Sequence, residues 1–477
     1  MTMRLTDVDV EARSPEPLRS LIGGPRAANF DAIAAEARAL LAGRAVVNVN
    51  STATGGGVAE LLQTLLAYAR GLGIDARWQV IQGEPAFFAI TKRIHNHLYG
   101  TAGDGGPLGA AERRTYEATL HGHAAELATT VRPGDVVLLH DPQTAGLAAA
   151  ARQAGGIVVW RCHVGVDVAG PEVERAWTWL RPYIDDVDAF VFSKRSFAPD
   201  WIDGARVHVI APSIDPFSAK NYDMPDDEAA RVLRYAGLLA GEDRPEPAPF
   251  VRRDGSVGRV DRHVDILQTG PPPPSDAPIV AQLSRWDRLK DMAGVMAGFA
   301  EHVAGTTDAH LVLAGPAVTG VADDPESAQV LDECTVLWRS LPHAQRSRVH
   351  LACTPMRDPD EAAAIVNALQ RHSAVVVQKS LAEGFGLTVA EAMWKGRAIV
   401  ASDIGGIGEQ IVDGEHGLLL DDPADLATFG AAVRRLLGDP ALAQKLGGNA
   451  RRRAAELFLP DRHLEQWAAL LAVAVAG

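Results

Sequence analysis

Short apolar runs alternate with helix-forming stretches along most of this 477-residue chain. Each run has the length of a strand, and glycine, polar or charged residues follow it before the next helical stretch begins. Strands that alternate with helices predict a parallel sheet covered by helices on both faces. The expected strands form two groups: residues 45–50, 77–83, 136–140, 157–163, 189–193 and 207–213, and then 279–284, 310–315, 348–354, 374–379, 398–402 and 417–420.

The composition changes between these two groups. Residues 241–277 are charged and rich in proline and glycine, which is typical of a connection between domains. We therefore predict an α/β protein of two doubly wound, Rossmann-like domains that face a central cleft. The expected bounds are 1–240 for the N-terminal domain, 241–277 for a linker or insertion and 278–457 for the C-terminal domain, with a helix at 458–477 that joins the N-terminal domain.

Charge and hydropathy limit the partners of the chain. It has 60 acidic and 46 basic residues, which give a net charge of −14 and argue against nucleic acid, whose binding needs a basic patch. No run approaches the ~20 apolar residues of a membrane helix, and residues 1–30 lack the apolar segment of a secretory signal. The three cysteines show no disulfide or zinc spacing. We expect a cytoplasmic protein with neither nucleic acid nor a membrane as partner.

The string EGFGLTVAEAMWKG, residues 383–396, follows the expected strand 374–379. It places Glu383 in a glycine-flanked turn and Glu391, eight residues later, in the helix that follows. The start of a helix presents free N–H groups and partial positive charge, which suit a diphosphate, and a carboxylate can bind paired sugar hydroxyls. The alternative is that both glutamates are solvated acids near a helix end.

The string SRWDRLKD, residues 284–291, directly follows the first strand of the second half. Its Arg285 and Lys290 can stabilise the charge that develops on a departing phosphate oxygen. Arg288 is a competing cation, and a surface basic pair that caps a helix is the alternative interpretation.

A third string, NVNSTATGGGVAE at 48–60, combines a strand, a loop with Gly55, Gly56 and Gly57, and a helix. No Lys-Ser/Thr pair follows the glycines, and the spacing is not that of a dinucleotide-binding loop. A tight turn needs fewer than three glycines, so we favour a ligand-facing loop over a purely structural turn.

Polar residues also follow two further strands of the first half. His163 follows the strand IVVWRC, and Asp141 and Gln143 follow VVLLH in the same way. A lone histidine is more often structural, but the ends of parallel strands are where ligands bind. Asp141 and Gln143 are candidates for binding the hydroxyls of an acceptor. Asp185, Asp186 and Asp188 precede a strand, and we interpret them as a turn, so we expect no metal site.

The strings at 284–291 and 383–396 resemble the signatures of retaining glycosyltransferases of family 4, which have the two-domain GT-B fold. The resemblance implies that Glu383 binds the transferred sugar, that Glu391 binds the nucleotide ribose, and that Arg285 and Lys290 bind the pyrophosphate. It also implies that His163 contacts the donor sugar or the reaction centre. The donor-binding residues would be Gly55, Gly56, Gly57, Gly384, Phe385, Gly386, Leu387, Thr388 and Glu391, and the catalytic residues Arg285, Lys290, Glu383 and His163.

The first half carries a narrower resemblance. The strings VNVNSTATGGGVAELL, FFAITKRIHNHLYG, HDPQ, WRCHVGVD and APSIDPFSAKN are similar to trehalose synthases of the glycosyltransferring type and to the related trehalose phosphorylases. This implies transfer of glucose from ADP- or UDP-glucose to glucose, forming trehalose. Trehalose phosphorolysis, or transfer to another acceptor, stays open. No cofactor is expected, although Mg²⁺ can accompany the nucleotide, and a homodimer is compatible with the resemblance.

Overall fold

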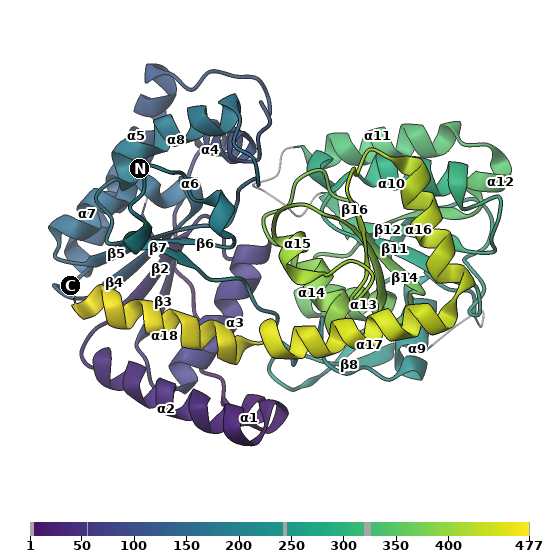
Figure 1. Ribbon diagram of the computed structural model, residues 1–477, viewed down its shortest axis with the longest axis horizontal. Coiled ribbons are helices and arrows are strands. Elements are labelled where there is room, and N and C mark those ends of the chain that lie inside the picture. Colours follow the sequence, from purple (N-terminus) through teal and green to yellow (C-terminus); the bar gives the residue numbers. More distant parts are fainter. Residues whose placement is uncertain (1–3, 55, 242–245, 319–325, 477) are drawn as a thin grey trace. The chain divides into compact units, whose positions relative to one another are not determined.

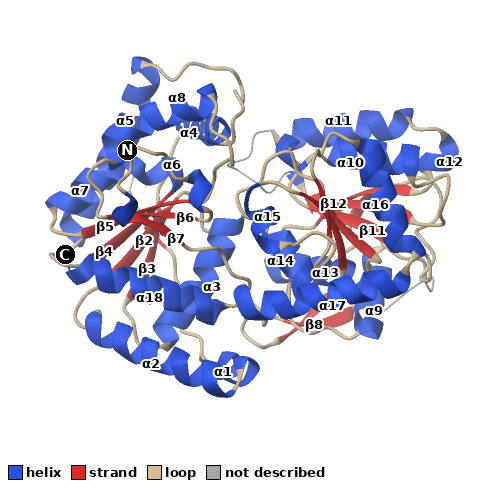
Figure 2. Ribbon diagram, viewed as in Figure 1, coloured by secondary structure: helices blue, strands red, loops and turns tan. Residues whose placement is uncertain are grey.

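The computed structural model describes residues 4–54, 56–241, 246–318 and 326–476. The chain divides into two compact units (Figure 1). Unit one comprises Met1–Ser213 and Pro460–Gly477, and unit two comprises Ile214–Leu459. Each unit has its own largely parallel sheet with helices on both faces (Figure 2). The α/β class with two parallel-sheet domains, predicted from the alternation of strands and helices, is confirmed.

The sheet of unit one has the strand order β1-β3-β2-β4-β5-β6-β7 among the described residues, and only β1 runs antiparallel to its neighbour. Alternate residues of each strand face opposite layers of helices. Val47 and Val49 pack with α4, α5 and α8, whereas Val46 packs on the other face with α18. The strands are β1 Thr6–Asp7, β2 Val46–Asn50, β3 Ala76–Val80, β4 Val136–His140, β5 Ile157–Cys162, β6 Ala189–Phe192 and β7 Val207–Val209, and the main helices are α2 Gly24–Leu40, α3 Gly57–Gly71, α4 Pro85–Leu98, α5 Ala110–Thr130, α8 Pro171–Ile184 and α18 Pro460–Ala476.

The sheet of unit two has the order β10-β13-β12-β11-β14-β15-β16 in the described part of the chain, with β10 antiparallel at one edge. One face packs on α10, α11 and α16, and the other on α9 and α13. The strands are β10 Asp265–Leu267, β11 Ile279–Leu283, β12 His310–Pro316, β13 Val349–Thr354, β14 Val375–Gln378, β15 Ala398–Ser402 and β16 Leu418–Leu420. The helices are α9 Asp226–Ala236, α10 Met292–His302, α11 Ser327–Ser340, α13 Pro359–His372, α14 Leu387–Trp394, α15 Gly405–Gln410, α16 Leu426–Gly438 and α17 Pro440–Leu457.

The boundary between the units lies at 213/214, earlier than the expected 240/241. The described part of 241–277 is not a bare linker, because it forms the hairpin β8 Ala248–Val251 with β9 Val257–Val260 and then the edge strand β10. Phe250 and Val260 are buried against α13. Glu361 of α13, which is 1% exposed, accepts hydrogen bonds from two backbone N–H groups of this segment. The charged, proline-rich composition therefore belongs to a hairpin with one exposed face.

The C-terminal helix α18 belongs to unit one, although the helix before it, α17, belongs to unit two. Pro460 separates the two helices, as expected of a residue that begins a helix readily and cannot continue one. Leu470 and Leu471 of α18 are buried against the sheet of unit one. Asp461, which is 1% exposed, forms an ion pair with Arg26 of α2. None of the helices in the described residues is long and apolar enough to cross a membrane.

Candidate active site

Lys290 and Glu383 form a close ion pair at the carboxyl edge of the sheet in unit two. Lys290 Nζ lies 2.6 Å from Glu383 Oε2, and the side chains are 16% and 11% exposed. Lys290 ends a 3-10 turn after β11, and Glu383 lies in the loop between β14 and α14. Because β11 and β14 are adjacent parallel strands, their ends bring the two residues together although 93 positions separate them.

A buried glutamine fixes the two loops that carry this pair. Gln282, on β11, is 0% exposed. Its amide nitrogen donates to the carbonyl oxygen of Lys290 at 2.6 Å, and its oxygen accepts from the N–H of Lys379 at 3.0 Å. A further backbone bond joins Leu381 to Leu289. Gln282 was not predicted as a site residue, because its only signal in the sequence is that it is a polar residue inside the apolar run IVAQL.

The three cations of the string 284–291 lie in different surroundings. Arg285 Nη2 contacts Asp287 Oδ2 at 3.2 Å within the same loop. Arg288 instead turns to α11, where its guanidinium meets both oxygens of Glu333 at 2.5 and 2.8 Å with both side chains 47% exposed. Lys290, and not Arg288, is thus the cation that meets Glu383.

The loop before α14 combines close backbone packing with a left-handed residue. Gly386 has φ +84° and precedes the first residue of the helix, Leu387. Gln410 donates to the carbonyl oxygen of Phe385. A Cβ at Gly406 would lie 2.6 Å from Phe385 Cα and 2.7 Å from Gly384 O, so only glycine allows this approach.

Two residues of α14 contact other segments of unit two. Thr388, in its first turn, contacts the carbonyl oxygen of Leu283 through its hydroxyl at 3.3 Å. Glu391 is 3% exposed and lies 3.3 Å from Lys220 Nζ. Its burial rules out a freely solvated acid. Lys220 was missed as a partner, because nothing in its local sequence distinguishes it from a surface lysine.

In unit one, the glycine loop leads into α3. Gly55 lies outside the described residues. Gly56 has φ +85° and caps α3, and Gly57 is the first residue of that helix. The positive φ at Gly56 accounts for one glycine of the three on conformational grounds.

Asp141 has an unusual backbone and a perturbed carboxyl group. It is one of two non-glycine residues with positive φ in the described chain, at 64°. It begins the short helix α6 Asp141–Thr144, which also contains Gln143. Its Oδ1 accepts a hydrogen bond from the backbone N–H of His163 at 2.7 Å. Desolvation by burial raises the pKa of Asp141 to about 7, although that hydrogen bond and nearby Arg161 act in the opposite direction.

The ring of His163 is engaged by buried side chains of unit one. Its Nε2 lies 3.1 Å from His140 Nδ1, and His140 Nε2 lies 3.1 Å from Asn48 Oδ1. Arg161 Nε lies 3.2 and 3.4 Å from the two ring nitrogens of His163. Desolvation lowers the pKa of His140 to about 3 and that of Arg161 to about 9. Asn48, His140 and Arg161 were not predicted as site residues, because in the local sequence each is a polar residue in a buried strand.

The described residues contain no group of three or more histidine, cysteine, aspartate or glutamate side chains that could hold a metal ion. Asp188, from the acidic triplet, has a structural role. Its carboxylate accepts from the N–H of Val158 at 2.7 Å and pairs with Arg152 at 2.6 Å.

Solved structures with a similar fold are GT-B glycosyltransferases. α,α-Trehalose-6-phosphate synthase from Burkholderia multivorans matches with a TM-score of 0.65 and 17% identity, covering 91% of this chain and 99% of that chain. Sucrose-phosphate synthase from Thermosynechococcus elongatus matches with a TM-score of 0.57 and 17% identity, covering 90% and 97%. The fold is therefore GT-B, as predicted, and with the sequence matches below it defines the protein as a glycosyltransferase.

The sequence matches narrow this class. Residues 48–199 match the N-terminal domain of trehalose synthase, and residues 269–453 match glycosyl transferases group 1. The chain is 32% identical to trehalose synthase of Thermococcus litoralis over 97% of both chains, and 32% identical to that of Rubrobacter xylanophilus over 89% of both. Trehalose phosphorylase of Pleurotus pulmonarius is 25% identical over 85% of this chain and 54% of its own. The chain belongs to the trehalose synthase family.

Proposed function

We propose that this protein is a retaining glucosyltransferase that moves glucose from an NDP-glucose, ADP- or UDP-glucose, onto glucose, giving trehalose and the nucleoside diphosphate. The trehalose synthases that are similar to it along nearly the whole chain support the product. The observation that carries the proposed chemistry is the pair of Lys290 and Glu383 at the carboxyl edge of the sheet in unit two.

Unit two would bind the donor. Lys290 and Arg285 offer cations to the pyrophosphate, whose leaving oxygen gains charge in the transition state. The N–H groups of Leu387 and Thr388 at the start of α14 suit the distal phosphate. Glu391 would bind the ribose hydroxyls.

The transferred glucose would lie against the loop at the end of β14. Glu383, which Lys290 holds in place, offers a carboxylate to the hydroxyls of the sugar. The backbone of Gly384, Phe385 and Gly386 would line the same position, because Gln410 and the absence of a side chain at Gly406 keep this loop in one conformation.

Unit one would bind the acceptor glucose. Asp141 and Gln143 would bind its hydroxyls through hydrogen bonds, and His163 would lie beside the reaction centre. Gly56, with its neighbours Gly55 and Gly57, would approach the donor phosphates. In the transfer, the bond from the anomeric carbon to the phosphate oxygen breaks and the bond to the acceptor oxygen forms on the same face, while the acceptor's proton passes to the departing phosphate.

The remaining expectations belong to this proposal. We expect the enzyme to need no cofactor, with Mg²⁺ entering only with the nucleotide. We expect it to act in the cytoplasm, without a nucleic acid or membrane partner. A homodimer is compatible with the proposal.

A product assay tests the proposal. Purified protein is incubated with glucose and either ADP-glucose or UDP-glucose, and trehalose and free nucleotide are measured. A parallel reaction contains trehalose and inorganic phosphate. Trehalose formed with one donor supports the proposal and identifies the base. Turnover only with phosphate would make the protein a phosphorylase, and nucleotide release without trehalose would point to another acceptor.

A further inference from the structure

Three side chains form a hydrogen-bonded chain across neighbouring strands of unit one. It runs from Asn48 on β2 through His140 at the end of β4 to His163 just after β5, and these strands are adjacent in the sheet. Both links measure 3.1 Å. The two imidazole rings are stacked with centroids 5.4 Å apart and an interplanar angle of 20°. Asn48 is 3% exposed and His140 is 2% exposed, so the bond between them is shielded from solvent, whereas His163 is partly exposed.

The direction of these bonds fixes the position of each proton. The side-chain oxygen of Asn48 can only accept, so Nε2 of His140 carries the hydrogen. A neutral His140 then has a bare Nδ1, which accepts a hydrogen bond from Nε2–H of His163. A neutral His163 then has a bare Nδ1, which lies 3.4 Å from the donor Nε of Arg161 and accepts its hydrogen. The 3.2 Å contact between Arg161 Nε and Nε2 of His163 is not a hydrogen bond in this tautomer, because both atoms carry a hydrogen.

The charges around His163 oppose a second proton on its ring. Burial is the main cause that lowers the pKa of His163 well below its ordinary range, and the guanidinium of Arg161 is the next. His140 and His463 act in the same direction. The carboxyl group of Asp141 binds the backbone N–H of His163 and offers no ring contact that would favour a charged imidazole.

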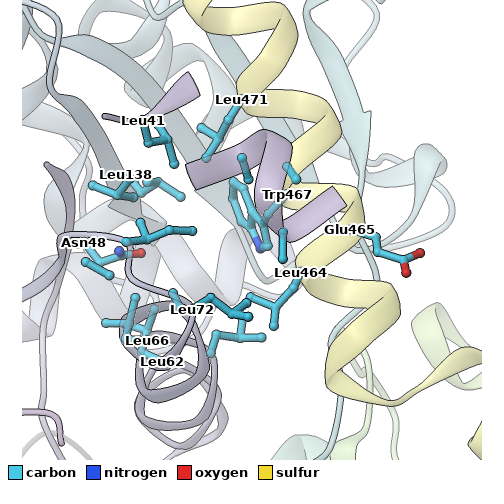
Figure 3. A pocket seen from close by; sticks show the side chains of 18 of the residues that line it. Leu41, Asn48, Leu62, Leu66, Leu72, Leu138, Leu464, Glu465, Trp467 and Leu471 are labelled. Carbon is cyan, nitrogen blue, oxygen red and sulfur yellow. The ribbon is translucent and has the colours of Figure 1, made fainter. Parts of the chain in front are cut away.

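Packing alone does not hold the hydrogen-bonded residues in place, because Asn48 and His140 border a cavity. The cavity has a volume of about 90 Å³ and lies between the strands and the helices α2, α3 and α18. Figure 3 shows leucine side chains and Trp467 of α18 around it, with Asn48 on its wall. The cavity is otherwise apolar, and its polar lining residues are Asn48, His140, Arg161 and Glu465. Side chains that face a cavity lack contacts on that side, so their hydrogen bonds carry more of their positioning.

We infer that Asn48 and His140 are positioning residues that hold His163 as a neutral imidazole with its proton on Nε2. In this state Nε2–H of His163 is donated to His140, and Nδ1 accepts from Arg161 at 3.4 Å, so the ring has no proton to give to a substrate. His163 would therefore not act as a general acid in the transfer. The protonation state follows from unit one alone, whereas its effect on turnover rests on the proposed function.

Nuclear magnetic resonance of the full-length protein with ¹⁵N-labelled histidine tests the protonation state directly. His163→Gln assigns the signals. We expect His163 to show a protonated Nε2 and a bare Nδ1 throughout about pH 6 to 8, the range in which an ordinary histidine titrates. Asn48→Leu should give a mixture of the two tautomers. A proton on Nδ1, a second proton at pH 6, or no change in Asn48→Leu would overturn the inference.

Turnover supplies the second readout. His140→Leu removes both bonds, whereas His140→Gln can still donate to Asn48 and accept from His163. We expect kcat to fall by roughly 10- to 100-fold in His140→Leu and Asn48→Leu, as when a partner behind an active-site ligand is lost, and to be largely kept in His140→Gln.

Ala468→Leu is the matched control, because Ala468 lines the cavity from α18 and is not one of the hydrogen-bonded residues. It should leave both the His163 tautomer and kcat unchanged. An equal loss in Ala468→Leu and His140→Leu would mean that packing governs the site and would overturn the inference. If the wild type forms no trehalose, the proposed function fails, and the ¹⁵N spectrum still decides the protonation state.

Discussion

At the scale of single residues, the two halves of the candidate site use charge in opposite ways. In unit two, Glu383 is paired with Lys290 at 2.6 Å, so its charge is compensated within the protein. In unit one, Asp141 is partly exposed and has no ion pair among the described residues, and desolvation raises the pKa of its carboxyl group to about 7. The cation holds the paired carboxylate in place, whereas the carboxyl group without an ion pair can exchange its proton near neutral pH.

Replacement of Lys290 tests the first arrangement. Lys290→Met removes the cation proposed for the pyrophosphate and leaves Glu383 without its partner. We expect kcat to fall by about 10²- to 10³-fold, the cost of losing one group that stabilises developing charge. Steady-state kinetics with NDP-glucose and glucose measure it. Arg288→Met, in the same turn but paired with Glu333, should stay near wild type, and an equal loss in both variants would refute the assignment.

Asp141→Asn tests the second arrangement through stability. The pKa of Asp141 is higher in the folded protein than in the unfolded chain, so the folded state binds more protons between about pH 4 and 7 and loses stability as pH rises through that range. Asparagine does not ionise and tolerates the positive φ of this position. We expect the Tm of Asp141→Asn to match that of the wild type near pH 4 and to exceed it at pH 8. The difference should be about 2–4 °C for each kcal/mol of destabilisation that the substitution removes. Calorimetry at both pH values checks this, and a Tm difference that does not grow with pH would contradict it.

At the scale of elements, the local pattern predicted most of both sheets. Runs such as VVLL, the first four residues of β4, are apolar throughout because a parallel strand is covered on both faces. The ends of these strands also predicted where Lys290, Glu383 and Asp141 lie. The hairpin β8–β9 was not predicted, because its alternating exposed residues and prolines resemble a linker.

The local sequence pattern did not predict the partners of the site residues, for a different reason. Gln282 bonds to Lys379 across 97 positions, and Asn48 bonds to His140 across 92. Such contacts depend on the order of strands in the sheet. The sequence places each residue on its strand, but it does not give that order.

The close approach of α15 to the loop before α14 predicts that a side chain at Gly406 would displace this loop. In Gly406→Ala, the new methyl group would meet Phe385 Cα and Gly384 O at less than 3 Å, so the loop must move. We expect a destabilisation of about 1–3 kcal/mol, typical of overpacking, together with a higher KM for the donor. Chemical denaturation and donor kinetics measure both. Gly438→Ala, at the end of α16 where nothing lies within 4 Å of the new Cβ, is the matched control and should be close to neutral.

At the scale of the whole molecule, the chain builds two units with separate cores and returns to the first at its end. Unit one is completed by α18, which buries Leu470 and Leu471 and places Trp467 over the guanidinium of Arg161 at 5.6 Å. A chain that ends at Leu459 should therefore lose the stability of unit one while unit two keeps its complete core. Calorimetry of the truncated and full-length proteins, with limited proteolysis to identify the surviving unit, would show this. Equal loss in both units would contradict the division.

The proposed function depends on the passage of glucose from a nucleotide to a second glucose. The most direct measurement uses glucose labelled with ¹³C at its anomeric carbon, together with unlabelled ADP- or UDP-glucose, and follows the reaction by ¹³C nuclear magnetic resonance. We expect trehalose that carries the label in one of its two α-linked halves, formed in step with nucleoside diphosphate. Label that remains in free glucose while the donor is consumed, or a β-linked product, would contradict it.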